Sequence, residues 1–541
     1  MKRSIEIGKF KSYGFPLLYS AAILFIAYKF ATFYNPVVGF AWLPQFGESF
    51  EARRTDELRA TDYLVTSRYG YDGQYYAQLA LSPTLQDEGL EESVDNFNYR
   101  ARRIFFSWTA YVLGLGNPDW VIQVYSIQNV LFWFLFAGLL WRWFPPKCWQ
   151  NAARFIGMLF APGLVVSAKA ALLDGPSLCL IALAAYFLEK GRIVAACSLL
   201  GASGLGRDSS VLSASMITLP KGWNWREWAA YVSRGIAVIA PLAFWMAYVS
   251  SVSSQIGGNT GIGAFNYPFY SWFKGLKENL ETLFQSGWKS WNAVYFLMLF
   301  TLMLQALYFV FRPAWKSMWW RLGIVNALLM FVLGDAVWEG NLGAVVRVVL
   351  PMCLAFNLLV PRSRFGFCLV LVANSLCVFS IVDIGRTISP DPYNRFVESK
   401  PYGLNLDLKT RRTFDLEFEN EWFNLEWRWK DYWRWTSNDA SIKYTVHDSI
   451  GYKGRLRFQL RADQSRSVAV SVNGSEAMVV ELNLDERSDW LHIDLDLVPG
   501  LNDIRFSSDR PADEVEVGSS GDKYFLKFAL YNYFLEILPQ D

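Results

Sequence analysis

Histidine is almost absent from this chain of 541 residues, since the sequence contains only His447 and His492, both far along the chain. The long apolar part that precedes them must therefore work without histidine, which excludes histidine-based catalytic triads and histidine-ligated metal sites there. Cysteine is scarce as well. All six cysteines lie in or beside apolar runs without metal-ligand spacing, so we expect small core residues and no disulfide framework.

Charge is also sparse, because Asp, Glu, Lys and Arg make up 18% of the residues, whereas 53% are hydrophobic. A soluble chain of this length would form several domains with charged surfaces. The apolar residues instead cluster in long runs between residues 15 and 383, and a helix needs about 20 such residues to cross a bilayer. The net charge of +2 identifies no partner.

The apolar runs predict a polytopic α-helical membrane protein with about eleven spans. Basic residues occupy the N-terminal segment and every turn that falls on the same side, which places the N-terminus in the cytoplasm and the C-terminal region outside. Residues 104–115 are too short to span and are expected to form a re-entrant or interfacial helix. The predicted spans are residues 16–34, 119–141, 152–172, 176–188, 193–205, 209–219, 229–249, 291–311, 322–338, 342–360 and 365–382.

Three regions follow from the change in composition along the chain. Residues 1–385 form the predicted membrane domain, with an extracytoplasmic loop at 35–103, and residues 386–439 form an aromatic-rich linker or docking segment. Residues 440–541 alternate apolar and polar over short runs, which predicts an all-β sandwich resembling a jelly roll. Asn473-Gly474 between two runs predicts a hairpin turn. The docking segment contains Trp422, Trp427, Trp429, Trp433 and Trp435.

These tryptophans have two plausible uses. Their amphipathic rings suit a membrane surface, and the position of the segment directly after the last predicted span favours this use. The alternative is that they stack on the sugar rings of an acceptor.

One carboxylate, Asp72, stands on an Asp-Gly turn inside the loop at 35–103. Tyr75, Tyr76 and Leu79 follow at helical spacing, which predicts a helix with an aromatic and apolar face. A carboxylate on a tight turn before such a helix is exposed yet held in place, as a general base must be. The alternative is that Asp72 caps the helix.

Several arginines fall on the same predicted side. Arg100, Arg102 and Arg103 precede the short helix at 104–115 and break the positive-inside trend, which suggests an anionic ligand; headgroup contact is the alternative. Arg347 lies in an apolar stretch and needs a phosphate or carboxylate partner. Asp335 and Glu339 are candidate carboxylates.

Two further positions combine charge with a helix end. Asp174 lies at an outside turn before a helix, where starting the helix is its ordinary role. Arg207 and Asp208 separate two apolar runs and could bind a ligand or form a buried ion pair. Arginines and one carboxylate on one surface suit a lipid phosphate entering from the bilayer and a hydroxyl acceptor entering from outside.

These residues resemble short motifs of the membrane glycosyltransferases of the GT-C fold, which use polyprenyl-phosphate sugars. Tyr71-Asp72-Gly73-Gln74-Tyr75-Tyr76 is similar to their Tyr/Trp-Asp-Gly-x-x-Tyr motif, and Tyr99-Arg100-Ala101-Arg102-Arg103-Ile104 to a Tyr-Arg-x-x-Arg motif. Leu205-Gly206-Arg207-Asp208-Ser209 resembles an Arg-Glu-Thr/Ser element with Asp in place of Glu, and Val346-Arg347-Val348-Val349-Leu350-Pro351 an Arg-x-x-x-Pro element. The following β-sandwich resembles one appended to some bacterial members.

The resemblance implies an integral membrane enzyme, in a bacterial inner membrane, that transfers sugar from a polyprenyl-phosphate donor to an extracytoplasmic glycan, lipid or protein. Asp72 would be the catalytic base or would orient the acceptor. The residues implied to bind substrate are Tyr71, Gln74, Tyr75, Tyr76, Arg100, Arg103, Asp174, Arg207, Asp208 and Arg347. Some relatives use Mg²⁺ or Mn²⁺, although no metal ligands are assigned here, and no nucleic-acid partner is expected.

Two other functions stay open. A transporter or flippase of lipid-linked saccharides would use the arginines to line a path, and such proteins often show internal repeats and interrupted helices. No repeat is visible in this sequence. A membrane-anchored carbohydrate-binding protein is the other, and it leaves the charges at the helix ends without a purpose.

Overall fold

A computed structural model describes most of the chain and divides it into two compact units. Unit 1 comprises Met1–Phe33, Ala52–Thr61 and Tyr71–Ile388, and unit 2 comprises Tyr34–Glu51, Asp62–Gly70 and Ser389–Asp541. The described residues are 2–35, 38–47, 50, 53–67, 69–220, 222–254, 264–286, 290–338, 344–387, 389, 404–405, 414–419, 421–423, 426–428, 431–446, 449–517 and 522–537.

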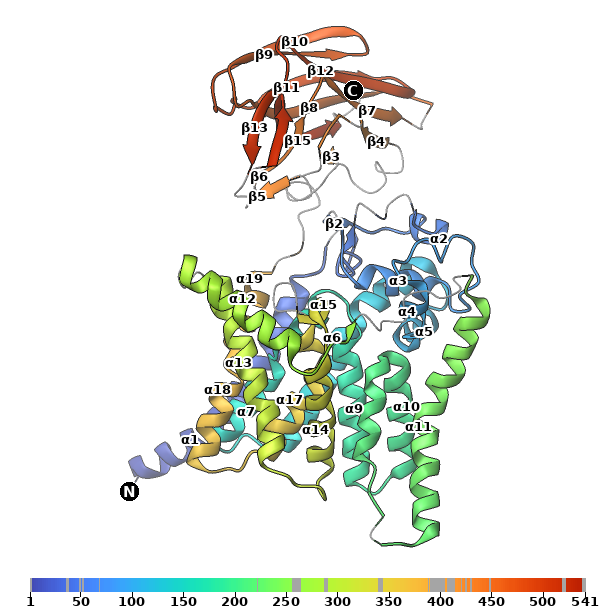
Figure 1. The fold of residues 1–541 in the computed structure, drawn as a ribbon, viewed down its shortest axis with the longest axis vertical. Coiled ribbons are helices and arrows are strands. Elements are labelled where there is room, and N and C mark those ends of the chain that lie inside the picture. The colour runs from blue at the N-terminus through green and yellow to red at the C-terminus, as the bar shows by residue number, and fades with distance from the viewer. Residues whose placement is uncertain are drawn as a thin grey trace. The chain divides into compact units, whose positions relative to one another are not determined.

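Unit 1 is helical (Figure 1). Its α-helices are α1 (Lys2–Ala31), α2 (Asp56–Arg59), α3 (Gly73–Leu81), α4 (Phe97–Ala101), α5 (Phe105–Leu113), α6 (Pro118–Trp143), α7 (Trp149–Leu159), α8 (Pro162–Lys169), α9 (Asp174–Glu189), α10 (Ile193–Gly206), α11 (Trp225–Val252), α12 (Tyr270–Ser286), α13 (Ser290–Phe311), α14 (Met318–Val332), α15 (Asp335–Trp338), α16 (Val345–Val348), α17 (Leu350–Leu359), α18 (Arg364–Ala373) and α19 (Leu376–Arg386). A 3-10 helix, η2 (Asp208–Met216), follows α10.

Five segments among the described residues are long and apolar enough to cross a membrane. They are Gly14–Ala31, Pro118–Trp143, Trp149–Lys169, Trp225–Val252 and Asn292–Phe311. A sixth results if α18 and α19, which are bent by 42° at a short break, count as one span. The prediction of an apolar helical region is therefore confirmed, whereas the count of about eleven spans is not.

The difference in count comes from short helices. α10 has 14 residues and α17 has 10, whereas an α-helix needs about 20 residues to cross the apolar layer. The predicted span at 209–219 overlaps η2, a 3-10 helix of nine residues. Hydropathy detects an apolar run but not how the chain breaks within it, so the sequence predicts turns between short spans at residues such as Asp174 and Arg207.

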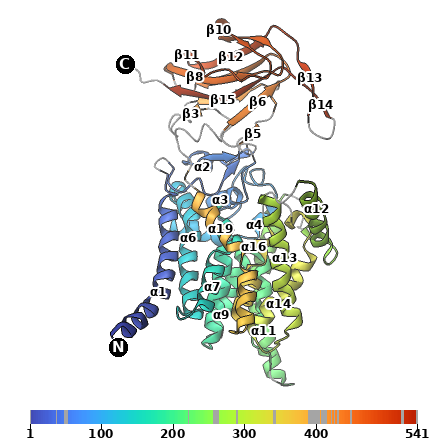
Figure 2. The same cartoon turned by 90° about the vertical axis from the view of Figure 1, so that its left-hand side faces the viewer.

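The helices that carry the charged residues pack side by side. α9 packs against α6 and α10, and α10 against α11. Figure 1 shows α9, α10 and α11 side by side, and Figure 2 shows the helices of unit 1 from another side. Gly206, the last residue of α10, packs closely against two neighbouring side chains. A Cβ atom at this position would meet the Phe106 ring and lie 2.9 Å from Ser177 Oγ. Glycine is therefore needed at the point where the chain leaves α10 for Arg207.

Unit 2 contains two larger β-sheets. The strands are β1 (Phe46–Gly47), β2 (Val65–Ser67), β3 (Leu404–Asn405), β4 (Phe414–Phe418), β5 (Glu426–Arg428), β6 (Asp431–Thr436), β7 (Ala440–Val446), β8 (Tyr452–Arg461), β9 (Arg466–Val472), β10 (Ser475–Leu482), β11 (Leu491–Leu497), β12 (Gly500–Ser508), β13 (Asp513–Val517), β14 (Asp522–Leu526) and β15 (Phe528–Ile537). One sheet has the order β10-β9-β12-β7-β4 and the other β11-β8-β15-β6-β5, with β3 beside β15.

The two sheets share one hydrophobic core, as a sandwich requires. Alternate residues of the central strands point inward, such as Ile442 of β7, Phe458 of β8 and Phe506 of β12, all fully buried. Asn473 and Gly474 both have positive φ, 49° and 83°, and connect the antiparallel strands β9 and β10. The predictions of an all-β region and of this hairpin are confirmed.

The segment before residue 440 also contributes strands to the sandwich. β4 pairs with β7, and β6 pairs with β15. Trp422 is buried in the shared core, and its indole Nε1 donates a hydrogen bond to the Ser441 carbonyl at 3.0 Å. Trp433 and Trp435 lie on the outward side of β6 and are partly exposed. Trp429 and the side chain of Trp427 lie outside the described residues.

Candidate functional site

Asp72 lies directly before α3, but its side chain makes no capping hydrogen bond to that helix. Its Oδ1 instead accepts a hydrogen bond from Arg100 Nη2 at 2.9 Å, and its Oδ2 lies 3.5 Å from Arg347 Nη1. The Asp72 side chain keeps 30% of its surface exposed. The carboxylate is therefore held by two guanidinium groups while one side stays accessible.

Arg100 is positioned by the short helix α4. Asn96 caps this helix by accepting a hydrogen bond from Tyr99 N at 3.0 Å. Asp95 then accepts from Arg100 Nε at 2.9 Å and from Nη2 at 2.8 Å, a two-pronged pair that fixes the plane of the guanidinium. The Tyr75 ring centroid lies 5.0 Å from the same guanidinium. Asp95 was missed by sequence reasoning.

Asp208 gathers the two other arginines of this stretch. It lies 2.8 Å from Arg102 Nη2 and 3.0 Å from Arg103 Nη2. Arg103 Nη1 also donates to the Tyr76 hydroxyl at 3.0 Å, and the Tyr99 ring centroid lies 4.5 Å from Arg102 and 4.2 Å from Arg103. Asp208 therefore binds two of the three arginines at 100–103.

Arg207 and Asp208 pair with different partners, because Arg207 forms an ion pair with Asp174. Asp174 is the first residue of α9, as predicted, and its Oδ2 also lies 3.4 Å from Arg347 Nη1. Asp335, one candidate partner of Arg347, pairs with Lys274 at 2.7 Å instead. The other candidate, Glu339, lies outside the described residues.

These ion pairs form two groups. One joins Asp72, Asp95 and Asp174 to Arg100, Arg207 and Arg347, and the other joins Asp208 to Arg102 and Arg103. The Tyr76 hydroxyl bridges the groups, since it accepts from Arg100 Nη1 at 3.4 Å and from Arg103 Nη1 at 3.0 Å. We call these five arginines and four aspartates the aspartate–arginine network. Taken at full ionisation, these members leave one positive charge in excess, which lies in the Asp208 group because the other group has three arginines and three aspartates. A buried excess of positive charge favours an anionic ligand.

The other predicted site residues lie beside this network. The Tyr76 hydroxyl accepts from Arg103, and the Tyr71 ring centroid lies 5.5 Å from the Arg347 guanidinium. Gln74 is fully buried on the first turn of α3. Arg347 Nε is buried without a hydrogen-bond acceptor among the described residues, and Arg347, Asp174 and Arg207 line a cavity of about 10 Å³, room for about one water molecule.

The electrostatic environment keeps Asp72 ionised. Burial by itself opposes the charged carboxylate, but Arg100 and Arg347 outweigh this effect and hold the pKa of Asp72 below its ordinary value. A carboxylate with a low pKa is a weak proton acceptor. In this state Asp72 is better suited to orient an acceptor than to deprotonate it.

The carboxylates do not form a metal-ligand set in the part of the chain that the structure describes, where no three Asp, Glu, His or Cys side chains gather around one point. Asp72, Asp174 and Asp208 are each engaged by guanidinium groups. These residues do not fit a divalent cation, which requires several oxygen ligands.

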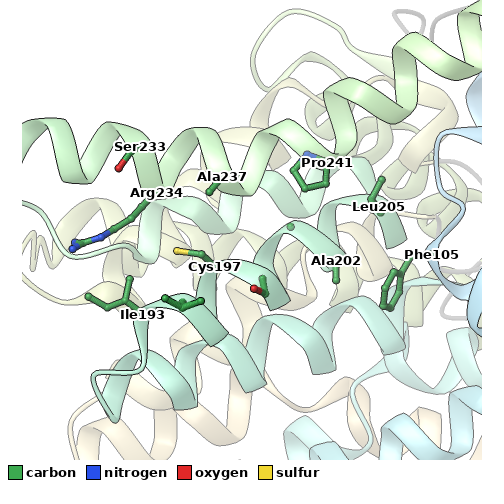
Figure 3. Close-up of a pocket in the computed structure, with 12 residues that line it drawn as sticks. Phe105, Ile193, Cys197, Ala202, Leu205, Ser233, Arg234, Ala237 and Pro241 are labelled. Carbon is green, nitrogen blue, oxygen red and sulfur yellow. The ribbon is translucent and has the colours of Figure 1, made fainter.

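An apolar groove lies between α10 and α11, with a cavity volume of about 680 Å³. Small residues of α10, Gly201 and Ala202, leave room for it. Figure 3 shows Arg234 and Ile193 near one end and Leu205 and Phe105 near the other. Because Leu205 precedes Arg207 by two residues, this second end lies next to the aspartate–arginine network along the chain.

Comparison with known proteins gives no family assignment. No family model matches the chain. No curated protein matches it either.

Similarities to solved structures are weak. A mutant family 29 carbohydrate-binding module is 14% identical over 23% of this chain and 81% of that chain, with a TM-score of 0.15. A carbohydrate-binding module in complex with β-1,4-galactotriose is 11% identical over 23% of this chain and 88% of that chain, with a TM-score of 0.15. The enzymatically active domain of tailspike protein 4 of bacteriophage CBA120 is 12% identical over 28% of this chain and 22% of that chain, with a TM-score of 0.14. Such values assign neither a ligand nor an activity.

The fold and the site define a class: a helical protein with several membrane-length apolar helices, a buried aspartate–arginine network and a β-sandwich.

One testable consequence concerns Gly163, which holds α8 close to α16. A Cβ atom at Gly163 would meet the Val346 carbonyl oxygen and lie 2.8 Å from Arg347 Cα. Gly163→Ala should therefore destabilise unit 1 by about 1–3 kcal/mol through overpacking. Thermal unfolding in detergent measures this. Gly138→Ala in α6 is the control, because a Cβ atom there meets nothing within 4 Å. Equal melting temperatures for the two variants would contradict the close packing at Arg347.

Proposed function

We propose that this protein is an integral membrane glycosyltransferase that moves a sugar from a polyprenyl-phosphate donor to an extracytoplasmic acceptor. The observation that carries the proposal is the combination of an arginine network with excess positive charge and an apolar groove that ends near it. A polyprenyl phosphate has the same two parts, an anionic head and a long apolar chain. Resemblance of the motifs at Asp72, Arg100, Arg207 and Arg347 supports the same class.

The arginines would act on the leaving group. When the bond between the sugar's anomeric carbon and the phosphate oxygen breaks, negative charge develops on the polyprenyl phosphate. Arg100 and Arg347 reach the same carboxylate from two sides, so a phosphate in that position would meet both guanidinium groups. The acceptor hydroxyl forms the new bond to the anomeric carbon and releases its proton.

Asp72 would orient the acceptor hydroxyl and take this proton. Donor binding would change its basicity, because the phosphate competes with Asp72 for Arg100 and Arg347 and also brings negative charge close to it. Both effects raise the pKa of Asp72 from its low starting value. The carboxylate would thus become an effective base after the donor has bound.

In this proposal the N-terminus lies in the cytoplasm, Asp72 and the sandwich lie outside, and the membrane is a bacterial inner membrane. The acceptor is a glycan, a lipid or a protein.

Broken helices favour one competing function, the transport of a lipid-linked saccharide. The segment Trp149–Lys169 is interrupted between α7 and α8, and α18 and α19 are bent by 42°; interrupted helices are common in transporters. Transport leaves the sugar–phosphate bond intact, whereas transfer breaks it. Release of polyprenyl phosphate from radiolabelled polyprenyl-phosphate monosaccharides by the purified protein distinguishes the two.

Asp72→Asn should lower the rate of transfer by about 10²–10⁴-fold, because it keeps the size of the side chain but removes the proton acceptor. The rate of polyprenyl phosphate release is the measurement. Asp87→Asn, at an exposed position, is the matched control and should be unaffected. Wild-type turnover by a folded Asp72→Asn variant would leave Asp72 with a structural role only.

The pH dependence gives a separate test with a defined sign. The donor kcat/KM follows ionisation of the free enzyme, and kcat follows that of the bound complex. Because the pKa of Asp72 is low in the free state and rises on donor binding, activity should be lost on acidification at a higher pH in kcat than in kcat/KM. Acid limbs at the same pH, or in the reverse order, would show that donor phosphate does not displace Asp72 from its arginines.

A further inference from the structure

The outward face of the six-stranded sheet in unit 2 carries a concentration of aromatic side chains. We define this aromatic face by Trp433 and Trp435 of β6, Tyr531 and Phe534 of β15, and Trp490, which directly precedes β11. Residues on either side of them along the strands, such as Tyr432 and Leu530, point into the core and are fully buried. The rings of Trp433, Trp435 and Trp490 therefore lie outside the hydrophobic core, whereas Phe534 also packs against its edge.

Two of these rings form a stacked pair. Trp433 and Tyr531 are direct cross-strand partners, and their ring centroids lie 5.1 Å apart at an interplanar angle of 16°. Tyr531 is only 5% exposed, whereas Trp433 is partly exposed. Tyr531 thus supports the Trp433 ring, which remains accessible to a ligand.

Two arginines contact Tyr531, the buried member of this pair. The Arg487 guanidinium lies 5.5 Å from the Tyr531 ring centroid, and Arg461 Nη1 donates to the Tyr531 hydroxyl at 3.3 Å. Each arginine also has a carboxylate partner: Arg487 lies 3.0 Å from Asp431, and Arg461 pairs with Asp485. The two arginines next to Tyr531 are thus neutralised by carboxylates, and Glu426, the cross-strand neighbour of Trp433, adds a negative charge that accepts a hydrogen bond from the Trp433 side chain. This charge pattern disfavours an anionic ligand.

The opposite sheet has no equivalent among the described residues of its three central strands. Outward positions there carry Lys443 and Thr445 on β7, Ala469 and Ser471 on β9, and Arg505 on β12. A β-sandwich therefore does not need aromatic rings on its outer surface to fold. Trp490 nevertheless leaves 55% of its surface exposed, and exposed apolar area of this kind marks contact sites.

From this arrangement we propose that the aromatic face binds a neutral glycan chain. One side of a pyranose ring presents only C–H groups and packs flat on an indole, as Trp433 offers. Sugar hydroxyls around the ring both donate and accept hydrogen bonds, which matches the alternating guanidinium and carboxylate groups of Arg487, Asp431 and Arg461. The proposal does not depend on the reaction in unit 1, and it chooses one of the two uses that the sequence leaves open for the tryptophans.

A membrane surface fits this face less well. Anionic headgroups attract unpaired Lys and Arg, whereas the arginines next to Tyr531 are paired with Asp431 and Asp485.

Affinity electrophoresis of the full-length protein in detergent, with neutral mannan, galactan or glucan in the gel, tests the proposal. At least one of these polysaccharides should retard the wild type. Trp433→Leu keeps apolar cover over Tyr531 but lacks an aromatic face, so it should bind that polysaccharide about tenfold more weakly, a loss of about 1.4 kcal/mol. Trp433→Phe should retain most of the binding, and Ser471→Ala, on the other sheet, should bind as the wild type does.

Three outcomes would overturn the proposal. These are the absence of retardation by all three polysaccharides, undiminished binding by Trp433→Leu, and retardation only by a polyuronate. If a fragment of residues 404–541 unfolds cooperatively, its binding to phosphatidylglycerol vesicles is measured by flotation. Vesicle binding that depends on Trp433, together with no polysaccharide binding by the full chain, would assign the aromatic face to the membrane. If Trp433→Leu fails to melt as the wild type does, Arg487→Gln removes the polar contact instead and should weaken the same interaction.

Discussion

The ion pairs that Arg100 makes with Asp72 and Asp95 are the constraint on which the rest of the site depends. A buried guanidinium is costly unless carboxylates and hydrogen bonds surround it, and Arg100 is only 8% exposed. Asp95 fixes the plane of the Arg100 guanidinium, and Asp72 accepts a further hydrogen bond from it. Arg347 of α16 then contacts the other oxygen of Asp72. These pairs connect the turn before α3 with α4, α9 and α16. The same contacts hold these short elements together and place the partly exposed carboxylate of Asp72 beside Arg100 and Arg347.

The aspartate–arginine network and the apolar groove lie next to each other along the chain in unit 1. The groove between α10 and α11 is lined mainly by small and aliphatic side chains, and α10 ends at Gly206, directly before Arg207. An amphiphile with an anionic head can bind the arginines with its head and the groove with its apolar chain. A soluble sugar lacks the apolar chain, and an uncharged lipid lacks the anionic head. For the proposed function, these two regions therefore constrain the head and the chain of the donor but not its sugar.

Much of the site could be predicted from the sequence, because charge in an apolar chain is rare and is therefore informative. Asp72, Arg103, Asp174, Arg207 and Arg347 do lie together. Asp95 was missed, since it lies in a charged loop where a single carboxylate is ordinary. Arg102 was grouped with Arg100 and Arg103 but lacks a motif position, so it was not assigned to the site. Partner choice was also beyond the sequence: Asp208 pairs with Arg103 rather than with its neighbour Arg207 because the backbone turns at the end of α10. Period-2 alternation predicted the β-region at 440–541, whereas the count of about eleven spans is not confirmed, because several apolar helices are shorter than a span.

The most direct test of the account is the binding of polyprenyl phosphate, compared with the uncharged polyprenol of the same length. Both share the apolar chain, so a difference in affinity reports the contribution of the aspartate–arginine network. The account predicts that the wild type binds the phosphate more tightly than the alcohol, and that Arg347→Gln removes this difference whereas Arg312→Gln, at an exposed position after α13, preserves it. Equal affinities of the wild type for the two lipids would contradict an anion site at Asp72, Arg100 and Arg347.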